Sequence, residues 1–553
     1  MCNFRRRLSV IPIGILMALF IAACGPSSQP GQPAKEEGKA SQAQTGPAKY
    51  GGTFVTANSS VAPSFDLISE GTGGTWLPTI PLYNGLLQYD VIDHEGMPTK
   101  IIPDLAERWD VSSDGLAYTF HLRKGVKFHD GAEFTSADAK FSLERIMEPP
   151  PKTPSLRQGW YKGFITRMET PDKHTLVVHL NQQYAAFIKL IATPVTPMVP
   201  KHLLEPYNTR ITDIKLLVGT GPFKMAEGDR TTGYKLAKNQ EYYRQDRPFL
   251  DGIDIQVIID DNLRIAAIKT GRVDSLLDSG APEPLLKSVK SEMGDRIVVT
   301  PILSLNGSRF WFNHKKKPFD DARVRKAIAL AFDNPAITKI AFDGAGCGGG
   351  YYAPIGEWGR PCDYWWKQAG FRTPTPEDLT EAKRLLAEAG YPDGFDTTLN
   401  NGYSAGNDRA HELLTPMLEK IGIKAKVRQL ERTAYYAAMD NGDFEMTSIG
   451  LGLSVDDPND FVGTQYITGA GRNYGGFSDS VVDRLYQEQS KTMDPNERKK
   501  LARQIEDRLV ELRPMIPMSW SQKTDVYASY VKGHKTVAGR FQDHRREHIW
   551  LDK

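Results

Sequence analysis

The sequence predicts an α/β protein built from more than one lobe. Segments in which apolar and polar residues alternate are interleaved with segments of helical periodicity from Gly51 to the C-terminus. The chain has 553 residues, well beyond the size at which a single hydrophobic core stops growing, so two or three lobes are expected. No repeat with a period of about 20 to 50 residues is present, which excludes solenoids and propellers.

The N-terminus has the features of an export signal. Arg5, Arg6 and Arg7 precede an apolar run over residues 8–23, which is shorter than the roughly 20 residues needed for a comfortable bilayer span. We therefore expect residues 1–23 to be a signal peptide. The run ends in Ile-Ala-Ala-Cys-Gly at residues 21–25, which resembles the lipobox of bacterial lipoproteins, and Cys24 would receive the lipid.

Residues 24–50 are expected to form a lipidated cysteine followed by a flexible linker. Between Gly25 and Lys49 the chain contains Pro, Gly, Ser, Gln, Ala and Lys but no large apolar residue, so it cannot bury enough surface to fold. A coil of this length has a typical reach of about 25 to 30 Å. The body would then lie in the periplasm or on the outer face of the cell membrane, held by its lipid anchor.

The periodic segments define the expected elements in order. Amphipathic helices are expected at residues 136–147, 262–270, 321–332, 379–389, 407–421, 479–490 and 496–512. A first strand is expected to begin at residues 51–55 and to be followed by a polar loop at residues 58–64, and further strands are expected at residues 117–122, 175–180, 253–259 and 424–430.

Three short motifs explain where elements begin and end. Ser113-Asp114-Gly115 lies between two apolar stretches and has the chemistry of a hairpin turn, in which glycine takes a positive φ. Thr135 stands three residues before Asp138 at a helix start, close to a capping box, and Gly390 is placed to end its helix as a left-handed cap.

The charge balance excludes a nucleic-acid partner. The 69 basic and 67 acidic residues leave a formal net charge of +2, and no long basic run provides a phosphate-binding surface. The densest basic segments, residues 314–317 and Arg545-Arg546, are interpreted as a solvated loop and a solvated tail.

The two cysteines of the body, Cys347 and Cys362, are expected to form a disulfide. They lie 15 positions apart in an exported domain, and such a bridge would stabilise the protein by roughly 3 kcal/mol. Two thiols without a nearby histidine form a poor zinc site, so no metal and no cofactor are expected.

No catalytic pattern is found. Gly344 to Gly349 fits G-x-G-x-x-G, but no strand leads into it, and the sequence lacks the H-E-x-x-H, G-x-S-x-G and phosphate-loop patterns. His411-Glu412 has no second histidine on its helix and is interpreted as a solvated face. An extracellular hydrolase is therefore the weaker alternative.

Several segments together resemble the extracellular solute-binding proteins of family 5, which include oligopeptide-, dipeptide- and nickel-binding proteins. The resemblance covers the chain from about Gly51 to Gly533. Its motifs lie at residues 103–109, 113–131, 134–138, 219–223, 271–274, 318–328, 385–391, 494 and 497–498.

This resemblance implies a type II periplasmic-binding-protein fold with two hinged lobes and an additional domain. By analogy, lobe I comprises residues 51–82, 218–300 and 513–553, the additional domain residues 83–217, and lobe III residues 301–512. In such a fold a solute favours the closed state, which the importer recognises.

Ligand contacts are expected at loops that follow strands, because clefts in open α/β sheets form at the carboxyl ends of strands. The first candidate loop contains Asn58, Ser59, Ser60 and Phe65. The second candidate is the aromatic strand Phe310-Trp311-Phe312-Asn313, from which Trp311 and Asn313 are the candidates.

The third candidate loop, residues 450–461, bears on the nature of the ligand. In oligopeptide- and dipeptide-binding family members, an aspartate that holds the ligand's α-ammonium stands four residues before a proline. Here Pro458 keeps its place but Ser454 replaces the aspartate, and Leu451 occupies the place of a tryptophan. Either Asp456 or Asp457 takes over the ammonium, or the ligand lacks a free amino terminus.

The expected function is capture of a peptide or similar small molecule for the permease subunits of an ABC importer, by a monomeric, membrane-anchored binding protein. An opine, an oligosaccharide or a metal chelate is the alternative ligand class. A sensory or chaperone role with the same fold also remains open.

Overall fold

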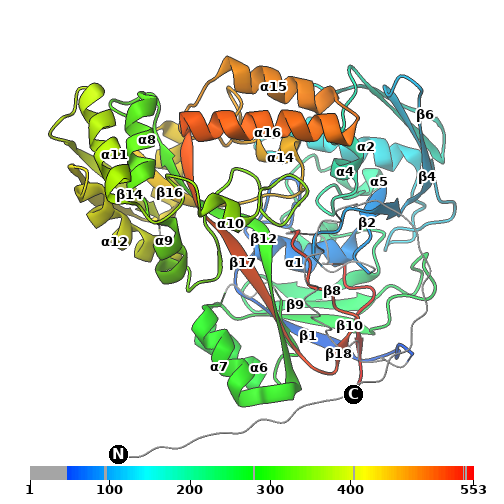
Figure 1. The fold of residues 1–553 in the computed structure, drawn as a ribbon. Helices are drawn as coiled ribbons and strands as arrows, with labels where there is room; N and C mark the ends of the chain where they lie inside the picture. Colours follow the sequence, from blue (N-terminus) through cyan, green and yellow to red (C-terminus); the bar gives the residue numbers. More distant parts are fainter. Residues whose placement is uncertain (1–46, 93–95, 278–280, 403–404, 540, 542–544) are drawn as a thin grey trace, which may run out of the picture. The chain divides into compact units, whose positions relative to one another are not determined.

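A large mixed sheet organises the part of the chain that the structure describes, residues 47–92, 96–277, 281–402, 405–539, 541 and 545–553 of a computed structural model (Figure 1). Its strands follow the order β15-β14-β16-β12-β17-β11-β1-β10-β9-β8, and β13 pairs with β17 outside this path. The bounds are β15 (Ile423–Leu430), β14 (Phe395–Gly402), β16 (Met446–Gly452), β12 (Ile297–Phe312), β17 (Met515–Ala528), β11 (Ser275–Leu276), β1 (Thr53–Asn58), β10 (Gly252–Val257), β9 (Gly233–Lys238), β8 (Phe223–Asp229) and β13 (Gly346–Cys347).

Two groups of helices accompany the two halves of this sheet. The half that contains β1 is accompanied by α1 (Gly73–Thr79), η1 (Ile80–Leu82), α6 (Asp261–Lys269), α7 (Glu283–Met293) and η3 (Gly294–Arg296). The half that contains β14 is accompanied by α8 (Ala322–Ala331), α9 (Asn334–Ala341), α10 (Cys362–Trp365), α11 (Pro376–Glu388), α12 (Ala405–Glu419), α13 (Arg432–Asn441), α14 (Pro458–Phe461), α15 (Ser480–Lys491) and α16 (Pro495–Leu512).

A separate antiparallel sheet lies between η1 and β8 in sequence, with the strand order β4-β5-β7-β6. Its elements and the short pairs are β2 (Leu87–Tyr89), β3 (Ile101–Pro103), β4 (Ala106–Val111), β5 (Ala117–Leu122), α2 (Ser136–Met147), α3 (Gln158–Tyr161), β6 (Ile165–Asp172), β7 (Thr175–Leu180), α4 (Phe187–Ile191), α5 (Lys201–Leu204), η2 (Ile214–Leu216), β18 (Val531–Lys532) and β19 (Trp550–Leu551). We refer to residues 83–217 as the additional domain.

Local sequence explains the boundaries of several elements. Gly115 has φ +71° in the turn that joins β4 to β5, as the Ser-Asp-Gly motif predicts. The backbone N–H of Thr135 donates to the carboxylate of Asp138 at 2.9 Å, which completes a capping box at the start of α2. Gly390 has φ +94° just after α11. The strands predicted at 117–122 and 175–180 and the helix predicted at 136–147 have the predicted bounds.

The hydrophobic cores divide the described residues unequally. One core contains Phe54 and Ile253 of the β1 half together with Phe120 and Val178 of the additional domain, so these two regions share their buried surface. The β14 half has two further cores, one around Trp311 and another beneath α8 and α12, and its Val455 belongs to the first core. A fourth core lies beneath α6 and α7.

Two interpretations of polar segments from the sequence are wrong. Arg545 and Arg546 are not a solvated tail, because Arg546 is fully buried and Arg545 donates to Asp104 at 2.6 Å. His411 is not on a solvated face either. It is buried, and its Nε2 lies 2.6 Å from the Ser448 hydroxyl. In both cases residues distant in sequence cover the side chain.

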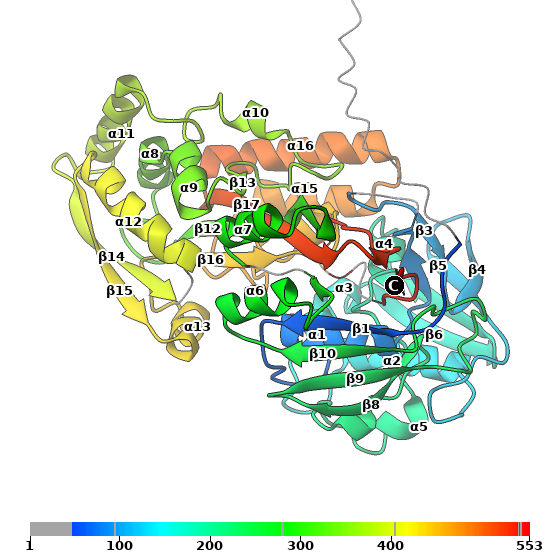
Figure 2. The same cartoon turned by 90° about the horizontal axis from the view of Figure 1, so that it is seen from below.

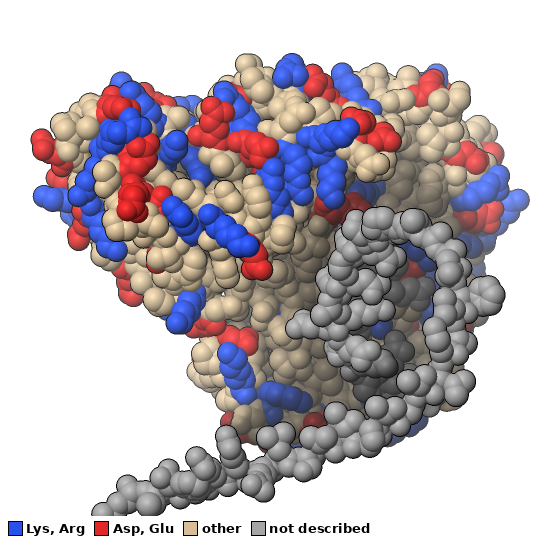
Figure 3. All heavy atoms as spheres, viewed as in Figure 1, with Lys and Arg blue, Asp and Glu red and all other residues tan. Residues whose placement is uncertain are grey.

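On the face shown in Figure 3, basic and acidic side chains are interspersed. They do not gather into one continuous basic surface there. Among the described residues, no helix is both long and apolar enough to span a membrane.

Candidate ligand-binding site

Two long strands connect the two halves of the large sheet. β12 pairs with β17 along most of its length, from Ile297 opposite Ala528 to Trp311 opposite Met515 (Figure 1). Their register shifts between Leu303, which pairs with Gln522, and Gly307, which pairs with Trp520. Between these two pairs β12 has two residues more than β17, which makes a bulge that bends and twists the two strands. We call residues 303–307 and 520–522 the crossing.

The carboxyl ends of the strands on both sides point toward the crossing. β11 is antiparallel to β17, pairing first at Tyr527 and then at Val526, so it runs toward residue 522, and β1 and β10 are parallel to it. β16 is antiparallel to β12 and ends with Gly452 opposite Asn306, and β14 and β15 are parallel to it. Figure 2 shows these two sets of strands on either side of β12 and β17. Ligand sites of open α/β sheets lie beyond such ends, so the crossing is the candidate site.

The loop after β1 brings small polar groups to this edge. Asn58 is buried, its Oδ1 accepts the Ser60 N–H at 3.2 Å, and its Nδ2 donates to the Gly73 carbonyl at 3.4 Å. Ser59 is exposed and Ser60 is half-buried. Asn58 therefore shapes the loop, while the two serines present hydroxyls at its surface.

Phe65 does not lie at this surface. Its side chain is buried in the core of the β1 half, where it packs edge-on against Tyr234 with ring centroids 5.7 Å apart, and the Arg230 guanidinium lies over it. The structure therefore gives Phe65 a packing environment instead of a place at the crossing.

The aromatic strand also serves packing. Trp311 is fully buried and stacks against Tyr466 with centroids 6.3 Å apart. The Asn313 amide donates to the carbonyls of Gly442 and Phe444, both at 2.9 Å. Asn313 follows Phe312, which pairs with the first residue of β16, so it lies about 20 Å along the strand from the loop that follows β16. Neither residue is brought to the crossing.

The loop that follows β16 holds the three polar candidates in different environments. Ser454 is half-buried, and its backbone N–H and that of Val455 donate to the Asp460 carboxylate at 2.6 and 3.0 Å. The Ser454 hydroxyl itself makes no hydrogen bond within the part of the chain that the structure describes. Asp460 thus fixes the loop so that Ser454 is presented near the crossing.

Asp457 is fully buried and already has a cation. Its two oxygens accept from the Arg498 guanidinium of α16 at 2.7 and 2.5 Å, and one also accepts the Asn459 N–H at 3.0 Å as a cap of α14. Arg498 and these hydrogen bonds offset desolvation and hold the pKa of Asp457 below its ordinary value.

Asp456 lies next to it in a different environment. One oxygen accepts the Glu357 N–H at 2.7 Å, and the other has no hydrogen-bond partner among the described residues. Gly356 permits this close packing, because a Cβ there would lie 2.1 Å from the carboxylate. Burial raises the pKa of Asp456 to about 7, although the Glu357 N–H and Lys189 oppose the shift.

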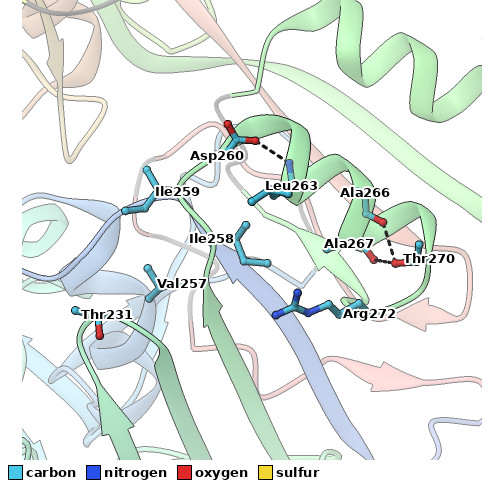
Figure 4. A pocket seen from close by; sticks show the side chains of 10 residues that line it. All are labelled: Thr231, Val257, Ile258, Ile259, Asp260, Leu263, Ala266, Ala267, Thr270 and Arg272. Carbon is cyan, nitrogen blue, oxygen red and sulfur yellow. Dashed lines mark hydrogen bonds between the residues drawn. The ribbon is translucent and has the colours of Figure 1, made fainter.

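A groove of about 540 Å³ runs beside α6 (Figure 4). Ile259 and Leu263 at its edge are 65% and 63% exposed, and Asp260 caps α6 by accepting the Leu263 N–H at 2.9 Å. All of its lining residues belong to β10, to α6, or to the loops that join β8 to β9, β10 to α6 and α6 to β11. Because nothing from the β14 half contributes, we do not assign the solute to this groove.

A family model described as bacterial extracellular solute-binding proteins, family 5 Middle, matches residues 100–473. The chain belongs to this family. The family 5 protein therefore has the type II periplasmic-binding fold, with two lobes and an additional domain, and it is a solute-binding protein of the ABC-importer class for peptides or related ligands. Members of the family are extracellular or periplasmic and bind substrates instead of converting them.

Relatives of this family 5 protein have different ligands in their names. It is 30% identical over 461 residues to the glutathione-binding protein GsiB of Salmonella choleraesuis, covering 82% of this chain and 85% of the relative. Among solved structures, it is similar to Helicobacter pylori DppA in complex with the peptide STSA, with 27% identity, a TM-score of 0.79 and coverage of 91% and 99%. It is also similar to AgaA of A. tumefaciens R10 in complex with agropinic acid, with 28% identity, a TM-score of 0.77 and coverage of 91% and 99%.

Sequence reasoning missed the residues that surround the Asp456 loop of this family 5 protein. Trp358 donates from Nε1 to the Asp456 carbonyl at 3.1 Å, and Lys189 of α4 lies 3.1 Å from Glu357. Arg498 was visible only as part of a family motif. No local pattern marks these residues, because they lie more than 40 positions from the loop or in another domain.

The disulfide holds part of this surrounding structure. Cys347 and Cys362 are bonded in the structure, with Cα atoms 5.8 Å apart, as their spacing led us to expect. The loop that they close contains Gly356, Glu357 and Trp358. No group of three or more potential metal ligands occurs among the described residues.

Proposed function

We propose that this protein captures a peptide or peptide-like solute at the crossing and delivers it to the permease subunits of an ABC importer. The observation that carries the proposal is the convergence of the carboxyl ends of both sheet halves on one point of β12 and β17. A bend at that point would move the halves as two lobes around the solute. The complexes of related proteins with a peptide and with agropinic acid support this ligand range.

The proposed lobes keep the boundaries drawn from the sequence. Lobe I comprises residues 51–82, 218–300 and 513–553, and lobe III comprises residues 301–512. The shared core of the β1 half and the additional domain supports treating lobe I and residues 83–217 as one moving body. Most residues of the two cores of the β14 half belong to lobe III, which supports treating it as the other body, and Met515, Ile516, Met518 and Trp520 of β17 pack in the same cores.

We also propose membrane attachment. Residues 1–23 would act as a signal peptide, Cys24 would carry the lipid, and the linker up to residue 50 would allow a monomeric body to reach its transporter. These segments lie outside the described residues except for Pro47 to Tyr50. Labelling with a radioactive or alkyne-bearing fatty acid in cells tests the anchor, and the Cys24→Ser variant should not incorporate the label.

The proposed contacts are Ser59 and Ser60 from lobe I and Ser454 from lobe III. Ser454 offers a hydroxyl in the position where the peptide-binding members have an aspartate, and each of the two nearby aspartates is buried against other residues. Asp457 is paired with Arg498, and Asp456 packs against residues 356–357. We therefore propose that the solute presents no free α-ammonium to this loop.

An opine is the second candidate, favoured by the 28% identity to a protein solved with agropinic acid. Native mass spectrometry of the purified protein would identify a retained solute. Calorimetry with a tripeptide, its N-acetylated form and agropinic acid would then rank the classes. Binding of the acetylated peptide or the opine without chemical change supports the proposal. Tight binding of the free-amine tripeptide alone would contradict the proposed ligand end, and turnover of any bound solute would contradict the binding role.

A further inference from the structure

Among the contacts between the additional domain and lobe III is a set of ion pairs made by one lysine. Lys189, in the middle of α4, lies 3.1 Å from Glu357 Oε2 and 3.7 Å from Asp457 Oδ2, and its ammonium is 5.4 Å from the centre of the Trp358 ring. Its carbonyl accepts the Tyr89 hydroxyl at 3.1 Å, which fixes α4 against β2 of the same domain. The backbone of Lys189 is therefore fixed within the additional domain, and its side chain pairs with lobe III.

Lobe III presents an unbalanced set of charges to this lysine. Asp457 is paired with Arg498. The Arg498 guanidinium lies 4.9 Å from the centre of the Trp358 ring, which Lys189 also contacts. The Glu357 carboxylate is half exposed, and Asp456 has one oxygen without a partner among the described residues. Near this lysine, lobe III thus presents the Glu357 and Asp457 carboxylates, the Asp456 carboxyl, whose pKa is raised to about 7, and one cation, Arg498. A second cation from another body offsets their mutual repulsion and their desolvation.

The additional domain is bound to lobe I much more extensively. Arg145 makes a buried bidentate pair with Asp66, at 3.1 and 2.5 Å. Asp104 accepts from the Tyr243 hydroxyl and from Arg545, both at 2.6 Å. In addition to these polar contacts, the additional domain and lobe I share a continuous hydrophobic core. A movement of lobe III would leave them intact, and it would separate the Lys189 pairs.

One backbone hydrogen bond crosses the same boundary. The Ala185 N–H donates to the Ser490 carbonyl at the end of α15, at 2.9 Å. Ser490 in turn accepts from the Asn459 amide through its hydroxyl at 2.8 Å, next to Asp457. Val455 of the loop that presents Ser454 is buried in the hydrophobic core that contains the additional domain, so the boundary combines these polar contacts with an apolar one.

We propose that Lys189 and the carboxylates of Glu357 and Asp457 form a latch that holds lobe III against the additional domain and thereby favours the closed state. This inference rests on the hinged capture proposed above. The latch acts at the loop of residues 454–457, so a solute that orders this loop also places the carboxylates for Lys189. Solute binding and latching are then coupled, and each strengthens the other.

The test measures the lobe positions without any solute. Spin labels are attached at Lys173→Cys in the additional domain and Lys500→Cys on α16, whose side chains are 75% and 67% exposed, in a full-length background with Cys2 and Cys24 replaced by serine. Pulsed electron paramagnetic resonance then gives the ratio of long to short distances. Lys189→Met keeps the apolar stem but removes the charge. It should raise this ratio about three- to tenfold, as expected for a partly buried ion pair.

The matched control is Lys140→Met, which removes an equal charge from the same domain. Its ion pair with Glu144 lies within α2 and does not reach lobe III. The control should leave the distances unchanged. A cycle with Glu357→Gln completes the design, because Lys189→Met should have a smaller effect when Glu357 is already neutral.

An unchanged ratio in Lys189→Met, or an equal change in Lys140→Met, would overturn the latch. Because these distances are measured without solute, they do not depend on whether the protein binds one. Failure of the proposed function would instead appear as wild-type distances that no peptide or opine shifts. Circular dichroism melts of the variants show that each is folded.

Discussion

Asp457 and Arg498 form a buried bidentate ion pair between the loop after β16 and α16, with N–O distances of 2.7 and 2.5 Å. The Arg498 side chain also donates from Nη2 to Asn459 Oδ1 and from Nε to the Gln489 carbonyl, so its charge is fully engaged. Breaking such a pair leaves an uncompensated buried charge.

Arg498→Met should lower the free energy of unfolding by about 3 to 5 kcal/mol because it removes the bidentate partner of buried Asp457 and leaves only Lys189, at 3.7 Å, as a nearby cation. Denaturant titration followed by circular dichroism measures this change. The double variant Asp457→Asn/Arg498→Met should recover part of the loss. Arg384→Met on the exposed face of α11 is the control and should cost less than about 1 kcal/mol. Equal effects of Arg498→Met and Arg384→Met would contradict the buried pair.

The Asp456 carboxyl should make stability depend on pH. Burial raises its pKa to about 7, whereas an unfolded aspartate titrates near 3.8, so the native state binds more protons between these values. The stability associated with this protonation is fully present at low pH and is lost as the pH rises toward 7. Thermal melts should therefore show Asp456→Asn more stable than the wild type at pH 8, by a few kcal/mol at most.

At pH 5.5 the difference should be about half of that at pH 8, because folded Asp456 is then neutral whereas the unfolded aspartate is already ionised. The two proteins should melt at similar temperatures only near pH 3.8. Comparing the variant with the wild type at each pH cancels the contribution of the histidines to the pH dependence of stability. His129, His314 and His411 have pKa values lowered to about 4 by burial, so the stability linked to them falls as the pH drops below 6.5. A difference between Asp456→Asn and the wild type that is the same at both pH values would refute the shifted pKa.

Restoring a carboxylate to the loop should change the ligand preference. Ser454→Asp places a charge at the half-buried position, where it can pair with an ammonium. We expect the affinity for a free-amine tripeptide to rise at least about tenfold, with no gain for its N-acetylated form. Calorimetry with both peptides provides the measurement. Ser478→Asp, in an exposed loop of the same lobe, should leave both affinities unchanged. A gain for both peptides would show that Ser454 does not face the amino terminus.

Removing the disulfide should destabilise the protein without unfolding it. The bridge closes a loop with a sequence separation of 15, for which chain entropy predicts about 3 kcal/mol. The variant Cys347→Ser/Cys362→Ser should therefore melt at a lower temperature, and a reductant should lower the melting temperature of the wild type but not of the variant. An unchanged melting temperature would indicate that packing alone holds residues 347–362.

Local features of the fold could be predicted because their causes are local. The turn at Gly115 needs only a residue that accepts positive φ, and the capping box of α2 needs only two side chains three residues apart. Periodicity likewise placed the seven helices that it predicted to within a few residues of their bounds. The burial of Arg546 and His411 was missed because the covering residues come from distant segments.

The candidate site was only partly predictable for the same reason. Sequence indicated the loops after β1 and β16, and the sheet pairing brings the ends of these strands toward the crossing. The sequence alone could not distinguish Asp456 from Asp457, which are adjacent and chemically identical. Their difference comes from Arg498, 41 positions away from Asp457, and from Gly356 and Glu357, which pack against Asp456.

The sequence by itself determined the family, the alternation of strands and helices, and the serine that replaces a carboxylate in the loop. Only the tertiary structure decided which polar side chains are paired, which are buried, and that Lys189 of the additional domain meets Glu357 of lobe III, 168 positions away. Backbone turns and periodicity depend on neighbouring residues. Charge pairing and desolvation depend on which distant segments the fold brings together.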